Sequence, residues 1–435
     1  MALTAMGQDG LVSDNESVFT YASPRLKFGA GSSNEVGHDL AALGVTRALL
    51  VTDPGIAASG VSDRVAEAIR AAGVEVVVYD RAHVEPTDAS MREAIEAARG
   101  LGRVDGVVAV GGGSSIDTAK AVDLMLTSPG DLLDYVNAPV GGGKAPQAPL
   151  LPFVAVPTTA GTGAESTSVC VLDVLARKVK TGISHERLRP VLAVVDPELS
   201  ATMPPGVTAA SGLDILCHAL ESYTARAYDS FPRKQPDKRV PYCGANPIAD
   251  MWSEKAMRLL ASAFRRAYRD GGDIDARLEM SMAATFAGLG FGNAGVHLPH
   301  ANAYPIAGQV RGFHPDDYPG NEAIVPHGMS VALTAPEAFR FTFDSSPERH
   351  LAAARMLAPE HAPTDDPRDD LPSVLVDLMR DVGQPSGLAE VGFGEGDVAS
   401  LVEGTLAQSR LLAICPKDPS DDDLAGVFTR SMENW

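Results

Sequence analysis

A carboxylate and an imidazole stand four residues apart in the segment SGLDILCHALESY, at Asp214 and His218. In a helix, this spacing places both side chains on the same face. Two further histidines follow in segments rich in small residues or proline, His300 in HLPHANAYP and His327 in VPHGMS. One carboxylate oxygen and three imidazole nitrogens suit Fe(II) or Zn(II) and leave room for a substrate oxygen. The pattern predicts a metal centre.

The identity of one imidazole ligand stays open on spacing alone. His297 lies three residues before His300 and can occupy the same helical face. A single buried histidine is more often a hydrogen-bonded core residue than a ligand. The metal interpretation is favoured here because an Asp and a His stand four residues apart and two more histidines follow. Cys217, next to His218, points elsewhere on the helix and is expected to pack in the core.

A run of small residues, Gly111, Gly112, Gly113 and Ser114, follows the apolar segment DGVVAV and precedes a segment of helical periodicity. Backbone amides at a helix N-terminus attract a phosphate, and residues without Cβ let it approach closely. We interpret the run as a pyrophosphate cradle. It is not the G-x-G-x-x-G fingerprint, and a tight strand-to-helix turn is the alternative.

Three aspartates lie near this cradle in the predicted fold. Asp53 ends the strand segment RALLVTD, where a carboxylate can accept hydrogen bonds from an adenosine ribose and disfavour a 2′-phosphate, which favours NAD over NADP. Asp117 is interpreted as a helix-start residue, whose charge suits the helix dipole, and Asp123 as part of a solvated face.

The segment PTTAGTGAES follows another apolar strand and supplies hydroxyls and backbone donors where the carboxyl ends of parallel strands meet a ligand. Lys180, in RKVKTG, is a further candidate for contact with the nucleotide, the alternative being a solvated lysine. The candidate residues of the first segment are Thr158, Thr159, Gly161, Thr162 and Gly163.

The elements that must position these residues fall into two halves. From 47 to 196, β-branched runs alternate with helical patterns, which predicts a parallel sheet with helices on both faces. After about Met203, long Ala-, Leu- and Met-rich stretches indicate helices alone. Because proline cannot continue a helix, PELSATMPPG is the candidate boundary. We predict an α/β NAD-binding domain over 1–203 and an all-helical, metal-binding catalytic domain over 204–435.

Composition agrees with a folded two-domain protein: 435 residues, of which 45% are hydrophobic and 21% charged. The formal charge of −20 argues against nucleic acid and anionic membrane surfaces as partners. The first residues carry neither a basic region nor an apolar stretch, so we expect no targeting peptide. The 4 cysteines form no C-x-x-C pair, which suits a reducing compartment. We expect a cytoplasmic protein.

Four motifs in this order, GGGSxxDxxK, PTTAGTGAE, GxDxxxHAxE and PHG, resemble the iron-containing, or group III, alcohol dehydrogenases over nearly the whole chain. The resemblance implies an N-terminal dinucleotide-binding domain that faces a helical domain, with the metal in the cleft between them. This plan is shared with dehydroquinate synthase. By the same resemblance, Asp117 joins the cofactor-binding candidates.

The resemblance also implies the roles of individual residues. It places the catalytic metal on Asp214, His218, His300 and His327, so that His297 becomes a neighbour of the site. Tyr304 stands where many members of the family carry a second histidine near the nicotinamide, and it is counted with the catalytic residues. Since a tyrosine has an ordinary pKa near 10, it is a poorer base at neutral pH than imidazole.

Within the family, the segments SPRLKFGAG, LDYVNAPVGGGK and GANPIADMW are similar to the hydroxyacid-oxoacid transhydrogenases. This branch implies hydride transfer from a hydroxyacid such as 4-hydroxybutyrate to an oxoacid such as 2-oxoglutarate through bound NAD. One alternative is an ordinary NAD-dependent alcohol dehydrogenase or aldehyde reductase that releases NADH. Another is a lyase resembling dehydroquinate synthase, which requires gathered basic residues that the ligand segments lack. A non-catalytic NAD-binding protein is a third.

A substrate that carries a carboxylate needs a cation or a nest of amides. The basic run in the segment from 233 to 239 is interpreted as a solvated surface loop, so no residue is assigned to the substrate anion. Small molecules are the expected partners, and association into a homo-oligomer is possible on this sequence. Because the ligand set accepts both metals, the supply of Fe(II) or Zn(II) decides which metal is bound. The basic residues of this run are Arg233, Lys234, Lys238 and Arg239.

Overall fold

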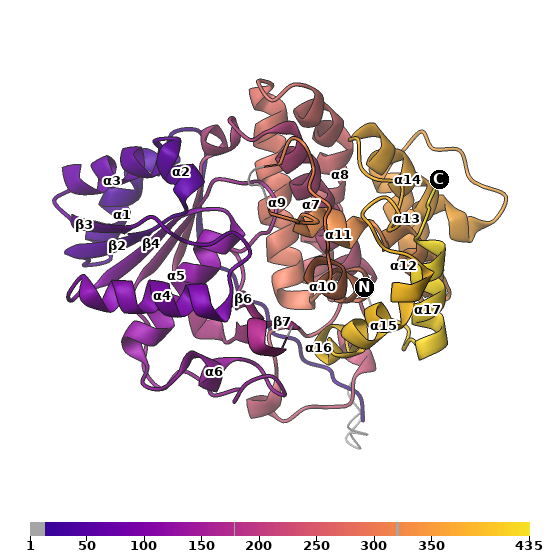
Figure 1. The fold of residues 1–435 in the computed structure, drawn as a ribbon, viewed down its shortest axis with the longest axis horizontal. Coiled ribbons are helices and arrows are strands. Elements are labelled where there is room, and N and C mark those ends of the chain that lie inside the picture. Colours follow the sequence, from indigo (N-terminus) through magenta and orange to yellow (C-terminus); the bar gives the residue numbers. More distant parts are fainter. Residues whose placement is uncertain (1–13, 178, 319–321) are drawn as a thin grey trace, which may run out of the picture.

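The computed structural model describes residues 14–177, 179–318 and 322–435, and it has two lobes (Figure 1). One lobe is built on a parallel sheet of six strands in the order β1-β8-β5-β4-β2-β3. The strands of this sheet are β1 (Arg25–Phe28), β2 (Arg47–Val51), β3 (Glu75–Tyr79), β4 (Gly106–Gly111), β5 (Phe153–Pro157) and β8 (Leu192–Val195).

Helices cover both faces of this sheet, and the side chains of β2 alternate between the two cores. Leu49 packs in the same core as Ile116 of α5, whereas Leu50 packs with Ile69 of α3. Every residue after the first in β2 is buried, which explains its continuous apolar run. The helices of this lobe are α1 (Val36–Ala42), α2 (Pro54–Ala58), α3 (Val61–Ala71), α4 (Asp88–Gly100), α5 (Gly113–Thr127) and α6 (Leu132–Tyr135).

Two features of this lobe are absent from the sequence prediction. The edge strand β1 pairs with β8, far along the chain, and its sequence RLKF is half exposed and carries no apolar run. An antiparallel hairpin of β6 (Val169–Val174) and β7 (Val179–Ser184) leaves the main sheet and lies toward the helical lobe (Figure 1). Both depend on pairing partners that local periodicity does not reveal.

After β8, every regular element of the described residues is helical, as the change in composition predicted. The predicted boundary at 203 falls just before the first of these helices, and its exact place stays a prediction. Within the described part of the chain, no helix combines the length and apolarity that crossing a membrane requires. The α-helices are α7 (Pro205–Thr224), α8 (Pro247–Arg269), α9 (Ile274–Ala294), α10 (Leu298–Gly308), α11 (His327–Ala332), α12 (Ala335–Thr342), α13 (Pro347–Leu357), α14 (Asp370–Asp381), α15 (Val398–Leu406), α16 (Ser409–Leu412) and α17 (Asp421–Arg430).

Helix α11 approaches the backbone of α7 closely, and Gly328 makes this approach sterically feasible. A Cβ at position 328 would lie 1.9 Å from the carbonyl oxygen of Ala210 and 2.8 Å from Cβ of Asp214. Since a carbonyl in a buried helix cannot swing aside, the absence of a side chain sets the distance between the two helices. The start of α11, with His327, is thereby held against the face of α7 that carries Asp214.

Replacing Gly328 with Ala should lower the free energy of unfolding by about 1–3 kcal/mol, because the added methyl overpacks a buried contact. Gly308→Ala is the matched control, since a Cβ there meets no heavy atom within 4 Å. Urea unfolding of both variants measures the difference. Equal midpoints for the two variants would contradict this account of the α7–α11 contact.

Asp123 does not lie on a solvated face, and that expectation is wrong. Its side chain is 1% exposed within α5, where Oδ1 accepts a hydrogen bond of 2.9 Å from the backbone amide of Leu151. The sheet and the connection after α6 cover the face of α5 on which it lies. Burial raises the pKa of Asp123 to about 7, and the hydrogen bond from Leu151 only partly offsets this.

The pKa of Asp123 in the folded chain exceeds its unfolded value, so the folded state binds the proton more tightly. Its contribution to stability is therefore greatest below about pH 4 and is lost as the pH rises toward 7, at about 1.4 kcal/mol per unit of pKa difference. Asn cannot ionise, so Asp123→Asn should gain stability relative to the parent over this range and level off above pH 8. Denaturant unfolding across pH tests this, with the exposed Asp63→Asn as control. A gain that is independent of pH would contradict it.

Candidate metal centre

One face of α7 carries three buried groups that can act on a metal. Asp214, His218 and Glu221 follow at spacings of four and three residues, and they are 2%, 4% and 0% exposed. The helix places the predicted Asp and His on a common face, as their spacing indicated. The remaining imidazoles come from α10, which carries His300, and from the first residue of α11, His327.

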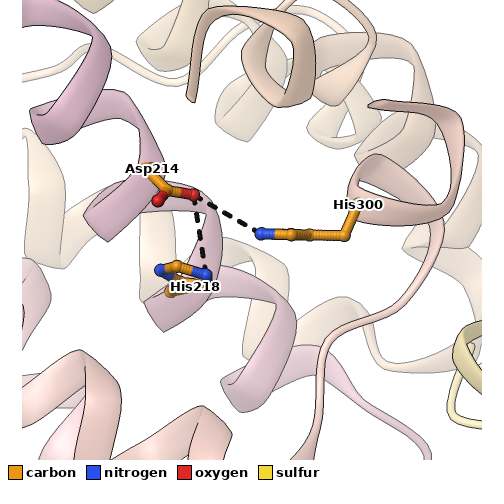
Figure 2. A group of neighbouring side chains, drawn as sticks. All are labelled: Asp214, His218 and His300. Atoms are coloured by element: carbon orange, nitrogen blue, oxygen red, sulfur yellow. Dashed lines mark ion pairs between the residues drawn. The ribbon is translucent and has the colours of Figure 1, made fainter. Parts of the chain in front are cut away.

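The three imidazoles converge on a single carboxylate oxygen, Asp214 Oδ1. Nε2 of His218 lies 3.5 Å from it, Nε2 of His300 3.4 Å and Nε2 of His327 3.8 Å. Figure 2 shows Asp214 and His218 side by side on α7, with His300 reaching toward them from the opposite element. Ligand atoms of these three residues all lie within 4.8 Å of one another.

These separations fit a bound cation. With ligand bonds of about 2.1 Å, the edges of a coordination tetrahedron measure about 3.4 Å. Asp214 Oδ1 and His300 Nε2 are buried and form no hydrogen bond with any described residue. Since buried polar atoms are normally partnered, two such atoms aimed at one point indicate a missing partner of positive charge. Asp214, His218, His300 and His327 are the residues that would hold it.

The carboxylates divide the imidazoles into two kinds. Burial alone would lower the pKa of His300, but the carboxylates of Glu221 and Asp214 raise it to about 10. Burial lowers the pKa of His218 to about 3, against the opposing effect of Asp214. The site therefore favours positive charge at His300, which contacts Glu221 and lies 3.4 Å from Asp214 Oδ1. A divalent cation would supply that charge without the proton.

Glu221 is a site residue that the sequence analysis missed as an individual position. Its Oε1 lies 2.6 Å from His300 Nδ1, and its Oε2 accepts a hydrogen bond of 2.5 Å from the backbone amide of His297. Such a carboxylate holds the ring of a ligand histidine in one tautomer, with Nδ1 protonated and Nε2 free for the metal. The signal was its position one helical turn beyond His218 on the same face.

His297, the competing histidine, lies outside this cluster. Its side chain is fully buried, and its Nε2 lies 3.1 Å from Thr224 Oγ1. The residue precedes α10, so its ring is directed into the core beside Phe339 instead of toward Asp214. Cys217, as expected, packs in the apolar core of the helical lobe.

A cavity with about 830 Å³ of empty space, open solvent included, joins the metal-binding face to the predicted phosphate cradle. Gly113, Ser114 and Thr162 line it from one lobe, and the four residues of the Asp–His cluster line it from the other. The carboxyl ends of the parallel strands and the helix α7 thus meet at one opening, where a nucleotide and a metal would lie side by side.

The glycine run and the Thr/Gly segment pack directly against each other. A Cβ at Gly113 would lie 2.8 Å from Thr162 Cγ2, and one at Gly112 would lie 3.3 Å from Thr159 Oγ1. Gly163 adopts a φ of +59°, and a Cβ there would lie 2.8 Å from the backbone of Gly288 in α9. The two lobes therefore touch through glycines, which draws the cradle toward the helical lobe. Gly161 packs on Ser211 in the same way.

Other nucleotide candidates are partly occupied by contacts within the chain. Asp53 caps α2 by accepting a hydrogen bond from the amide of Ile56, and its second oxygen accepts one from Ser115. Thr158 is buried, and Gly111 lies at the end of β4 beside Asp53. Contact of these residues with NAD stays a prediction.

Asp117 and Lys180 both line the cavity. Asp117 is 7% exposed and accepts a hydrogen bond from the amide of Val171, so it anchors the β6–β7 hairpin to α5. Lys180 forms ion pairs with Glu85 at 2.5 Å and with Asp173 at 3.0 Å. A nucleotide phosphate would therefore compete with two carboxylates for this lysine. Sequence reasoning found neither of these acidic partners.

Tyr304 lines the cavity one helical turn after His300, with its ring centroid 6.5 Å from that of His327. Burial raises the pKa of Tyr304 to about 12. The phenol is therefore neutral at physiological pH, where it can donate or accept a hydrogen bond but does not act as a general base.

Comparison with known proteins covers both lobes. The family model described as iron-containing alcohol dehydrogenase matches residues 23–197, and that described as Fe-containing alcohol dehydrogenase family, C-terminal, matches residues 241–432. The chain is 44% identical to a protein of Bos taurus named hydroxyacid-oxoacid transhydrogenase, mitochondrial, over 95% of the chain and 90% of the relative. The Homo sapiens protein of the same name is also 44% identical, with the same coverage.

Solved structures show the same architecture. A 1,3-propanediol oxidoreductase superposes with a TM-score of 0.82 at 30% identity, covering 95% of this chain and 100% of the other. A sulfoacetaldehyde reductase from Bifidobacterium kashiwanohense, solved in complex with NAD+, superposes with a TM-score of 0.78 at 27% identity, covering 94% and 98%. The fold and the order of the elements are therefore shared with oxidoreductases.

Replacing Glu221 with Gln should weaken metal binding by about 10- to 100-fold, because the neutral amide no longer fixes and polarises His300. Competition with a chromogenic chelator measures this affinity directly. Glu337→Gln is the control, a buried glutamate that pairs with Arg340 and Arg430 away from the cluster, and it should leave metal affinity unchanged. An unaltered affinity in Glu221→Gln would refute the positioning role.

Proposed function

The chain belongs to the iron-containing alcohol dehydrogenase family and is an oxidoreductase, and we propose that it transfers hydride between two acids through bound NAD. The donor is a hydroxyacid of the 4-hydroxybutyrate kind, and the acceptor is an oxoacid of the 2-oxoglutarate kind. The observation that carries the proposal is a metal-ligand cluster and a phosphate cradle that share one cavity. The transhydrogenase name of relatives 44% identical supports the choice of substrates.

The metal ligands and Tyr304 would act on the hydroxyl of the substrate. Asp214, His218, His300 and His327 gather around one point at the cavity floor and would hold the metal. A metal bound there supplies Lewis acidity that lowers the pKa of a substrate hydroxyl. Because this acidity removes the need for a strong base, the neutral Tyr304 beside His327 is sufficient to orient the hydroxyl by a hydrogen bond.

The residues at the start of α5 would position the nucleotide in the cavity. The amides at the start of α5 face the predicted position of the pyrophosphate, and Thr162 packs against Gly113, where a Cβ would not fit. Holding both reactants in one cavity turns hydride transfer into an intramolecular step. We propose NAD as the nucleotide, with Asp53 on the ribose side.

We propose Fe(II) as the metal. An oxygen and three imidazole nitrogens also accept Zn(II), which binds such sites more tightly, so the metal found depends on supply. A cytoplasmic location remains a prediction, and the curated relatives named above are mitochondrial. Assembly into a homo-oligomer likewise remains a prediction.

The proposal predicts turnover without added nucleotide. Purified protein incubated with 4-hydroxybutyrate deuterated at C4 and with 2-oxoglutarate should form 2-hydroxyglutarate that carries deuterium at C2, as measured by mass spectrometry. His327→Ala, which removes one of the converging imidazoles, is the negative control and should abolish the transfer.

An ordinary dehydrogenase of the same family would behave differently; one structural relative is named a 1,3-propanediol oxidoreductase and another an alcohol dehydrogenase from Oenococcus oeni. It would turn over only with free NAD and would accumulate NADH in step with the oxidised product. This pattern, together with no deuterated 2-hydroxyglutarate, would replace the transhydrogenase proposal by the dehydrogenase.

A further inference from the structure

The cavity contains a cation that neither the sequence analysis nor the proposed mechanism uses. Arg410, on the short helix α16, lines the same wall as Tyr304 and Tyr242. Its Nη1 donates a hydrogen bond of 2.9 Å to Ser184 Oγ at the end of β7, and its guanidinium lies 5.0 Å from the ring centroid of Tyr242. The residue is thus held between the helical lobe and the β6–β7 hairpin, at a place where the two lie together (Figure 1).

Arg410 differs from the other permanently charged cation of this cavity. Lys180 is neutralised by Glu85 and Asp173. By contrast, no Asp or Glu of the described residues forms an ion pair with Arg410, although acidic residues outnumber basic ones by 56 to 36 in the chain. A guanidinium has five N–H donors, and Ser184 uses one of them. The side chain keeps charge and donors for a ligand.

The surroundings favour an anion at this guanidinium. Valines and leucine form the apolar part of the same wall, and in such surroundings a charge acts through a lower effective dielectric than in water. Arg410 is also close enough to Tyr304 that its charge lowers the pKa of that phenol, against the stronger raising effect of burial. Arg410, Tyr304 and His300 all line the same cavity. The apolar residues of this wall are Val169, Val171, Val296 and Leu411.

We propose that Arg410 binds the substrate carboxylate and thereby makes the site selective for hydroxyacids and oxoacids over neutral alcohols. A planar guanidinium matches a carboxylate with two parallel hydrogen bonds, and Ser184 and Tyr242 hold it in orientation. The hydroxyl or carbonyl end of the acid then points toward the Asp–His cluster. This inference rests on the proposed function, because it assigns the group that recognises the acid at the same site.

The test compares two donors of equal chain length, 4-hydroxybutyrate and 1,4-butanediol, with 2-oxoglutarate as the common hydride acceptor. In Arg410→Gln, the ratio of kcat/KM for the acid to kcat/KM for the diol should fall by about 10- to 100-fold, the effect of one lost hydrogen-bonded ion pair. Arg410→Lys should recover part of the ratio, since it keeps the charge but not the paired donors. Arg233→Gln, which removes an exposed arginine from the basic surface run, should leave the ratio at the parental value.

An equilibrium measurement covers the case in which a variant is inactive. Titration calorimetry with succinate, a carboxylate that cannot react, should show binding to the parent and to Arg233→Gln and at least tenfold weaker binding to Arg410→Gln. Thermal unfolding verifies that each variant is folded. If affinity for NADH falls in Arg410→Gln while the acid-to-diol ratio stays constant, Arg410 serves the nucleotide and the inference is wrong.

The outcomes also separate this inference from the proposed function. Loss of turnover on both donors in equal proportion would overturn the role of Arg410 while leaving the transhydrogenase intact. If the parent protein oxidises 1,4-butanediol but neither binds nor oxidises hydroxyacids, the proposed function itself fails.

Discussion

The geometry of the site depends on one buried carboxylate oxygen, Asp214 Oδ1, on which three imidazole nitrogens from three helices converge. Burial alone would raise the pKa of Asp214, but the imidazoles of His218 and His327 keep it below its usual range. A charged oxygen held away from water requires a cationic partner, because desolvating an unpaired charge costs several kcal/mol. The helical lobe is therefore built around a position that a cation stabilises.

Close backbone contacts make this convergence possible. Helix α11 comes within reach of α7 because Gly328 has no side chain, and the lobes meet where Gly163 contacts Gly288. Lys120 secures the other side of the contact: its buried ammonium donates hydrogen bonds to the carbonyl oxygens of Ala164 and Val169. The lysine of the GGGSxxDxxK motif thus acts on the loop that carries Thr162, and its role is structural.

The positively charged groups of the cavity differ in whether they have a carboxylate partner. Carboxylates pair with Lys180 in the cavity, and Glu221 pairs with His300 in the metal-ligand cluster. Arg410, which also lines the cavity, has no such partner among the described residues. An acid entering the cavity of a protein with a formal charge of −20 would meet positive potential only locally, so the recognition of substrate is confined to the site.

Local periodicity in the chain was sufficient to predict the strands β2, β3, β4, β5 and β8, the helical second half, and the common face of Asp214 and His218. These features depend on residues that are near in sequence, so spacing and hydrophobicity report them. Spacing could not choose between His297 and His300, place Asp123 in the core, or indicate that Arg410 lines the cavity. Each of these depends on which distant segment packs against the residue. Only the tertiary structure decides them, because burial and ion pairing are set by contacts between elements far apart in the chain.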